Sequence, residues 1–252
     1  MSIINLTIDG VACTCEHGEL LFDVAKRNGI HIPALCRSDA FEDHRASCRI
    51  CIVEVETRGR TKIVTSCVYP VEQDCIVRTN TDRIREERAV VMALLLKRAP
   101  DSTLMQAMAK ELGADAGFDR LVTLDGEKCI LCGLCVQACD SLGTGAISTV
   151  DRGTEKRVDT PYSDPSLDCI GCLSCANVCP TDAISYTQTD TERTIWNRTF
   201  ELLHCPQCGK IMGTKDAVEK AASKVELEVP FVCDDCRRKA IADVMAKAHR
   251  SA

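Results

Sequence analysis

Residues 129–139 read CILCGLCVQAC, and residues 169–180 read CIGCLSCANVCP. Both runs place three cysteines two residues apart and a fourth after three more residues, which is the spacing that binds paired [4Fe–4S] clusters. In that arrangement the fourth cysteine of each run binds the cluster of the other run. The sequence therefore predicts two cubane clusters, the first held by Cys129, Cys132, Cys135 and Cys179 and the second by Cys169, Cys172, Cys175 and Cys139.

A disulfide framework or zinc thiolates could also use cysteines, but the pattern favours clusters. The nineteen cysteines lie in a chain of 252 residues, which is long for a disulfide scaffold. The start of the chain alternates apolar and polar residues like a strand and lacks the basic segment of a secretion signal. Such a pattern is typical of metal binding in a reducing compartment, so we expect a cytoplasmic protein.

Other function classes are disfavoured by composition. The longest apolar run, Ala89 to Leu96, is too short to cross a bilayer. The net charge of −6 argues against a nucleic-acid surface. The sequence also contains no Gly-rich dinucleotide fingerprint, no phosphate-binding loop and no supported catalytic triad, so we expect no catalytic residues in this chain.

A second kind of cluster spacing precedes the two runs. Cys36 is separated by eleven residues from Cys48, which is followed by Cys51 and, fifteen residues later, by Cys67. A loop that carries most of the ligands and a distant fourth cysteine suit a [2Fe–2S] cluster. The first gap is longer than in plant-type ferredoxins. The sequence predicts a [2Fe–2S] cluster held by Cys36, Cys48, Cys51 and Cys67.

A resemblance to a known family is found in three segments around these cysteines, which are residues 32–36, 48–55 and 66–67. They resemble the β-grasp ferredoxin domain that opens the large iron–sulfur subunit of respiratory complex I. The same domain opens the iron–sulfur subunits of NAD-reducing or electron-bifurcating hydrogenases and of NAD-linked formate dehydrogenases. The resemblance covers about residues 1–190. It implies a ferredoxin fold, these clusters and a flavin-containing partner that handles NAD(P)H.

One segment departs from that family. Many of its members carry a His-x3-Cys-x2-Cys-x5-Cys segment between the two ferredoxin domains, which binds an additional cluster. Here residues 97–103 read KRAPDST, and no cysteine occurs between Cys75 and Cys129. We therefore expect only the helical scaffold of that cluster to remain.

The expected fold class is α+β, in four parts. Residues 1–80 form a β-grasp [2Fe–2S] domain, 81–120 a helical linker, 121–190 a two-cluster ferredoxin domain, and 191–252 a zinc-ribbon-like tail. Apolar alternation predicts strands at residues 4–8, 11–14, 50–56, 62–65 and 76–78. Helices are expected at residues 19–28, on either side of Pro100, at 214–223 and at 234–249, and a hairpin at 150–160.

The tail carries two more Cys-x-x-Cys pairs. Cys205, Cys208, Cys233 and Cys236 have the form of two zinc knuckles that close on one ion. A further iron–sulfur cluster and a site without metal remain as alternatives. The three remaining cysteines, Cys13, Cys15 and Cys75, are expected to be buried structural thiols.

These patterns indicate a non-catalytic electron-transfer subunit of an NAD(P)H-linked oxidoreductase complex. It would contain one [2Fe–2S] cluster, two [4Fe–4S] clusters and one Zn²⁺, and would relay electrons between a flavoprotein partner and a catalytic redox partner. The alternatives are a free-standing polyferredoxin carrier and a redox-sensing regulator with a zinc-ribbon head. The terminal substrate stays open.

Overall fold

The computed structural model describes residues 3–41, 43–115, 117, 127–223 and 232–250. The chain divides into two compact units. Unit 1 contains residues 1–138, 149–158 and 178–184, and unit 2 contains residues 139–148, 159–177 and 185–252. The boundary passes through helix α4 (Leu134–Ser141), so the two units share one helix. The α+β fold class is confirmed, and each unit is described below by itself.

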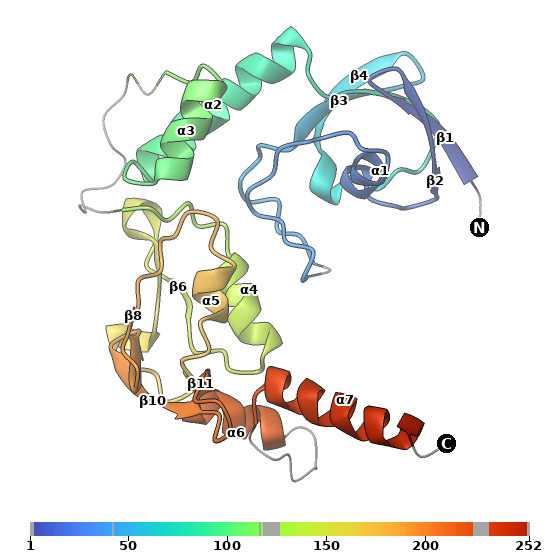
Figure 1. The fold of residues 1–252 in the computed structure, drawn as a ribbon. Helices are drawn as coiled ribbons and strands as arrows, with labels where there is room; N and C mark the ends of the chain where they lie inside the picture. The colour runs from blue at the N-terminus through green and yellow to red at the C-terminus, as the bar shows by residue number, and fades with distance from the viewer. Residues whose placement is uncertain (1–2, 42, 116, 118–126, 224–231, 251–252) are drawn as a thin grey trace. The chain divides into compact units, whose positions relative to one another are not determined.

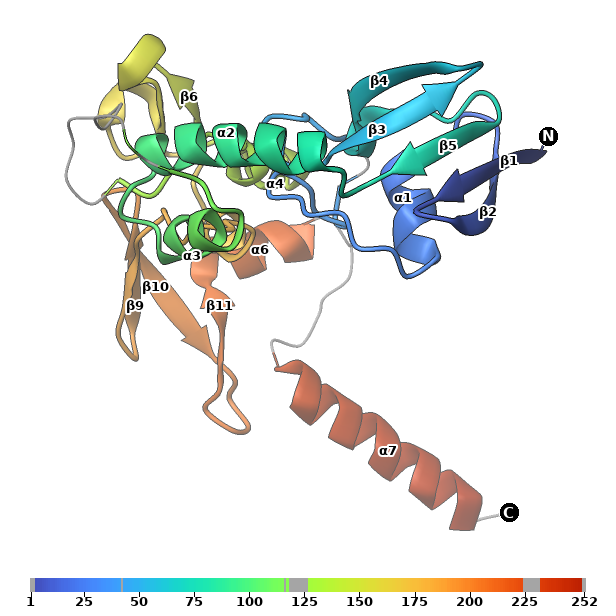
Figure 2. The ribbon, with the colours of Figure 1, turned by 90° about the horizontal axis from the view of Figure 1, so that it is seen from above.

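A five-stranded sheet in the order β2-β1-β5-β3-β4 forms the first half of unit 1 (Figure 1 and Figure 2). Its strands are β1 (Ile3–Ile8), β2 (Val11–Glu16), β3 (Ile52–Thr57), β4 (Arg60–Thr65) and β5 (Cys75–Arg78). Strands β1 and β5 are parallel, and the other neighbours are antiparallel. Helix α1 (Leu21–Arg27) buries its apolar face in the same core as Ile4, Leu6 and Ile8 of β1.

Two predicted boundaries in this sheet domain shift. Helix α1 starts two residues later than predicted, because Leu20 forms a β-bridge with Pro70 instead of a helical turn. Strand β3 starts at Ile52 rather than Ile50, and the first pair of its ladder with β4 is Ile52 with Thr65. Cys13, Cys15 and Cys75 are buried as expected, and burial raises the pKa of each thiol.

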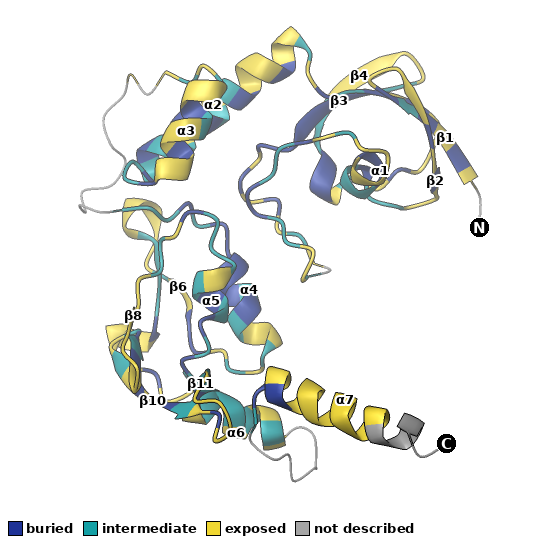
Figure 3. Ribbon diagram, in the orientation of Figure 1, coloured by how far each residue is buried: buried dark blue, intermediate teal, exposed yellow. Residues whose placement is uncertain are grey.

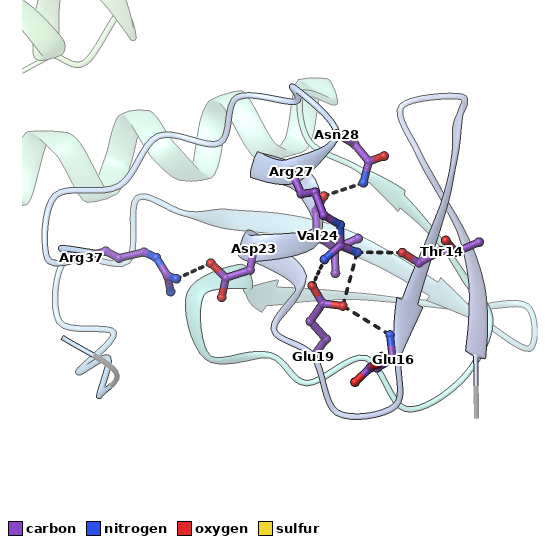
Figure 4. Close-up of polar contacts among 8 residues, drawn as sticks. All are labelled: Thr14, Glu16, Glu19, Asp23, Val24, Arg27, Asn28 and Arg37. Carbon is purple, nitrogen blue, oxygen red and sulfur yellow. Dashed lines mark hydrogen bonds and ion pairs between the residues drawn. The ribbon is translucent and has the colours of Figure 1, made fainter. Parts of the chain in front are cut away.

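Helix α1 anchors the start of the first cysteine loop (Figure 4). Arg27 pairs with Glu19 and donates from Nη2 to the Thr14 carbonyl of β2 at 2.8 Å. Arg37 follows Cys36 directly, pairs with Asp23 of α1, and lies 4.7 Å from the centre of the Phe22 ring. The backbone next to the Cys36 ligand is therefore fixed to a packed helix.

Helices α2 (Asp82–Arg98) and α3 (Thr103–Glu111) form a hairpin that breaks near Pro100, as predicted. Thr81 caps α2 by accepting from the Ile84 amide at 3.2 Å, and Ser102 caps α3. Met105 and Ala109 are the buried residues of α3, because residues four apart share one helix face, while Leu104 is 36% exposed.

Unit 2 is built on a four-stranded sheet that was not predicted from the sequence. Its strands are β8 (Thr187–Gln188), β9 (Glu192–Ile195), β10 (Arg198–His204) and β11 (Ile211–Thr214), in the order β11-β10-β9-β8. The predicted helices α6 (Lys215–Ser223) and α7 (Asp234–Arg250) follow, and α6 packs on β10 and β11. Figure 3 shows that α7 is exposed along most of its length.

The remaining elements are short. Strands β6 (Ser148–Val150) and β7 (Arg157–Asp159) form the predicted hairpin, and α5 (Ser174–Asn177) lies within the second cysteine run. Three 3-10 turns span Ser66–Val68, Gly153–Glu155 and Pro161–Ser163. Among the residues that the structure describes, no helix combines the length and the apolar character needed to cross a membrane.

Arg88 connects α2 to the first cysteine loop. Its side chain is buried and donates from Nε to the Ile50 carbonyl at 3.0 Å and from Nη2 to the Ile52 carbonyl at 2.7 Å. Burial lowers the pKa of this guanidinium. Ile50 lies between two predicted ligands, Cys48 and Cys51, so Arg88 fixes the backbone of that loop.

We predict that Arg88→Met destabilises the chain by about 2 kcal/mol, because two buried carbonyls lose a charged donor. Urea unfolding of the anaerobically purified protein, followed by circular dichroism, measures the change. Arg83→Met on the exposed face of the same helix is the matched control. Equal stabilities of the two variants would contradict the role of Arg88.

Candidate metal centres

Three cysteines of the first set lie in the loop between α1 and β3, and the fourth lies in the 3-10 turn that follows β4. Cys36, Cys48, Cys51 and Cys67 are all buried. The Cys36 sulfur accepts the Cys48 amide at 3.4 Å and also accepts from the thiols of Cys48 and Cys67, which lowers the pKa of Cys36 to about 2. The Cys51 sulfur accepts from the Cys67 thiol, and this lowers the pKa of Cys51 to about 6. The four sulfurs thus form one continuous series of contacts, from Cys48 through Cys36 and Cys67 to Cys51.

One cysteine of the second run lies close to the first three cysteines of the first run. The Cys179 thiol lies close enough to influence the titration of Cys129, Cys132 and Cys135. Burial is the main cause that raises the pKa of Cys132 to about 11 and that of Cys135 to about 12. All four cysteines belong to unit 1.

The second run gathers a cysteine from the first run in the same way. Cys139 and the three cysteines of the second run line a single cavity in unit 2, together with Trp196 and apolar residues. The Cys139 thiol also influences the titration of Cys169 and Cys175. The division into units therefore separates two quartets of cysteines, and each quartet is completed by the fourth cysteine of the other run.

The repeated alanine–isoleucine pairs that follow the two runs have a structural role. The Ala146 amide donates to the Cys139 sulfur at 3.2 Å, and the Ala183 amide donates to the Cys179 sulfur at 3.3 Å. A threonine hydroxyl also lies beside each sulfur, from Thr144 and Thr181 respectively. Each fourth cysteine is thus held by an equivalent pair of hydrogen-bonding groups.

Both runs bend the backbone at equivalent positions. The residues two and four positions after the first cysteine have positive φ: Leu131 (54°) and Gly133 (82°) in one run, Gly171 (64°) and Leu173 (64°) in the other. At Gly171 a packing constraint adds to the positive φ, because a Cβ atom at this position would lie 2.6 Å from the Phe200 ring. The second run therefore needs glycine at position 171 for both its φ and its packing.

The sheet of unit 2 holds the loop of the second run by its backbone carbonyls. Arg198 donates from Nη1 to the Cys169 carbonyl at 2.6 Å, and Arg193 donates from Nη1 to the Gly171 carbonyl at 2.7 Å. Thr214 donates to the carbonyl of Ile170. These residues were not predicted from the sequence, because the two-residue turn between β9 and β10 begins with Trp196, which this turn type does not favour.

The four tail cysteines form a tighter group. The sulfurs of Cys205, Cys208, Cys233 and Cys236 all lie within 4.8 Å of one another, and in the described part of the chain this is the one group of potential metal ligands so closely spaced. Cys208 and Cys233 are 3.5 Å apart, and Cys208 is exposed while the others are buried. Gly209, with φ of 73°, closes the turn between β10 and β11 that carries the first pair.

Comparison with known proteins identifies two domains. Residues 2–82 match the 2Fe-2S iron-sulfur cluster binding domain, and residues 128–183 match the 4Fe-4S dicluster domain. A solved structure of an NAD+-reducing [NiFe]-hydrogenase aligns with a TM-score of 0.60 and 27% identity, over 71% of this chain and 86% of the hydrogenase chain. This chain therefore contains both ferredoxin-type domains.

Several longer proteins are similar in sequence. The NADP-reducing hydrogenase subunit HndD of Solidesulfovibrio fructosivorans is 32% identical over 73% of this chain and 36% of its own length. An NADH-quinone oxidoreductase subunit from Rhizobium meliloti is 28% identical over 82% of this chain and 27% of its own length. The NADPH-Fe(3+) oxidoreductase subunit alpha of Geobacter sulfurreducens is 30% identical, with the same two coverages. The chain thus spans about a third of the length of these relatives or less.

We predict that Gly171→Ala weakens the second quartet selectively, because the added methyl group meets the Phe200 ring and the backbone keeps a positive φ. The backbone term alone is about 1–2 kcal/mol. Gly153→Ala is the control, since its φ is also positive but its Cβ would meet nothing within 4 Å. Iron content and thermal stability of both variants measure the effect. An equal, small loss of iron content and thermal stability in both variants would show that the Phe200 contact is unimportant.

Proposed function

Because this chain joins a 2Fe-2S cluster binding domain to a 4Fe-4S dicluster domain, we propose that it is an electron-transfer subunit of an NAD(P)H-linked oxidoreductase complex. Its partners would be a flavin-containing subunit that oxidises or reduces NAD(P) and a catalytic redox subunit. The names of the relatives support this class, since they are hydrogenase and NADH- or NADPH-dependent oxidoreductase subunits. The chain's own part is to hold the electron carriers.

The thiol groups suit three clusters. We propose that the β-grasp domain holds a [2Fe–2S] cluster on Cys36, Cys48, Cys51 and Cys67, because these four sulfurs contact one another. The quartet of Cys129, Cys132, Cys135 and Cys179 would hold the first cubane, and that of Cys139, Cys169, Cys172 and Cys175 the second. When bound, each cluster supplies a site that gains and loses single electrons.

The observation that supports an electron relay is the single continuous apolar core of unit 1. Cys36, Cys48 and Cys132 belong to the same cluster of buried residues. The Ser47 hydroxyl donates to the Cys132 carbonyl at 3.3 Å, which joins the loop of the first set to the loop of the first run. These residues would place the [2Fe–2S] cluster beside the first cubane in a dry environment.

Helix α4 supports the next step of the relay. It carries Cys135, a proposed ligand of the first cubane, and Cys139, a proposed ligand of the second, one helical turn apart. The helical hairpin of α2 and α3 occupies the segment where related subunits bind an additional cluster. There it contributes Met92, Ala99, Met105 and Ala109 to the apolar core of unit 1.

A free-standing polyferredoxin is the alternative that the same clusters allow. A separate carrier has no need of unit 2 beyond the second cubane, whereas this chain adds a four-stranded sheet, two helices and a further cysteine site. A redox-sensing regulator with a zinc-ribbon head is disfavoured by the net charge of −6. The subunit role accounts for more of the chain.

We propose a structural Zn²⁺ for the tail site. Zinc binds thiolates at about 2.3 Å, so four tetrahedral sulfurs lie about 3.8 Å apart. The spacing within 4.8 Å among the four tail sulfurs suits one such ion. A cubane has four irons between its thiolates and requires a wider group. The ion would close the turn between β10 and β11 onto the start of α7.

We predict that Cys139→Ser disturbs the second cubane and that Cys179→Ser disturbs the first, because the fourth ligands are exchanged between the runs. Electron paramagnetic resonance of the reduced, anaerobically purified variants resolves the two signals. The two variants serve as controls for each other. If each substitution removes the cubane of its own run, the exchanged assignment is wrong.

We predict about ten iron atoms and one zinc per chain, with two irons in the [2Fe–2S] cluster and eight in the two [4Fe–4S] cubanes. Replacing Cys205 and Cys208 by serine is expected to remove the zinc and leave the iron content unchanged. Metal analysis of the wild type and the double variant measures both. A loss of about four irons in the double variant would mean that the tail holds a cubane.

A further inference from the structure

Trp196 occupies a backbone conformation that does not suit it. It is the first residue of the two-residue turn between β9 and β10, and both turn residues have positive φ, 51° at Trp196 and 58° at Asn197. Asparagine and glycine adopt this conformation readily, whereas a bulky residue there is a strained outlier. Such strain persists where the surrounding structure benefits from the side chain.

The indole ring of Trp196 lines the cavity of the second quartet. All four cysteines of that quartet line the same cavity, together with Ile195 and Ile147. The indole Nε1 is buried and has no hydrogen-bond partner among the groups that the structure describes. Its N–H is directed toward the Cys175 sulfur. A buried donor without a full partner is costly, so the site requires an acceptor at this place.

The first quartet has no indole in the described residues, and the buried donor near it belongs to Arg98, whose Nε has no partner and whose Nη2 lies 3.7 Å from Glu127. Its fourth cysteine receives an amide and a threonine hydroxyl, as does that of the second quartet. The indole is therefore one difference between the two sites.

We propose that Trp196 donates its indole N–H to a sulfur of the second cubane and thereby raises the reduction potential of that cubane. This inference rests on the proposed function. A hydrogen bond to a cluster sulfur stabilises the more negative, reduced state and raises the potential. When the second cubane accepts one electron from the first, the first is oxidised, the second is reduced, and the indole keeps its proton.

Trp196 is thus a residue that tunes a potential and is not itself a ligand. By favouring reduction of the second cubane, it would increase the fraction of time that an electron spends on that cubane.

The test is a redox titration of the complete, cluster-loaded chain, followed by electron paramagnetic resonance. Trp196→Phe removes the N–H and keeps an aromatic ring. Benzothienylalanine at position 196 keeps the bicyclic shape and replaces the N–H by sulfur. Tyr186→Phe, at an exposed position of the same unit, is the matched control.

We expect both replacements of Trp196 to lower the equilibrium constant for reduction of the second cubane about tenfold, which is about 59 mV for one electron. The first cubane, the [2Fe–2S] cluster and the iron content should not change. Electron–nuclear double resonance should show an exchangeable proton coupled to the second cubane in the wild type and not in the variants. An unchanged potential, an equal shift of both cubanes or a persisting proton signal overturns the inference. A wild-type chain that holds only about six irons would instead overturn the proposed second cubane itself.

Discussion

Sulfur atoms from distant parts of the chain must meet within a few ångströms before a cluster or an ion can bind, and this constraint shapes the loops of the protein. Left-handed residues other than glycine gather beside the cysteines, at Ala46 and Arg49 around Cys48 and at Leu131 and Leu173 in the two runs. Each such residue costs on the order of 1 kcal/mol or more. The loops are therefore held by side chains outside them, among which Arg88 and Arg198 bind their carbonyls directly.

The two cysteine runs are alike in sequence but differ in what surrounds them. The first run packs Ile130, Cys132 and Leu134 into the apolar core that the α2–α3 hairpin completes. The second run is bound by the arginines of a sheet formed after it in the chain. A repeated ligand motif thus acquires two environments, and the potential of an iron–sulfur cluster depends on its hydrogen bonds and its exposure. The difference between the two sites lies in the scaffold and not in the ligands.

The residues that could be located from the sequence are those whose spacing is dictated by chemistry. Four thiolates around one cluster leave little freedom, so the quartets of cysteines could be named from their positions alone. Arg193, Arg198 and Trp196 act on residues more than twenty positions away, through contacts that depend on how β9 and β10 fold back. The turn between β9 and β10 could not be predicted from the sequence, because tryptophan is not a residue that this turn type favours. The four-part division of the chain and the ligand assignments stay predictions.

The exchange of fourth cysteines has a consequence for how such a chain can evolve. If Cys139 and Cys179 serve the opposite clusters, deletion of either run leaves the other with three thiolates, and a gene that loses one run damages both sites at once. The two runs are then inherited as a pair, and a lineage that simplifies to a single cubane must first recruit a new ligand.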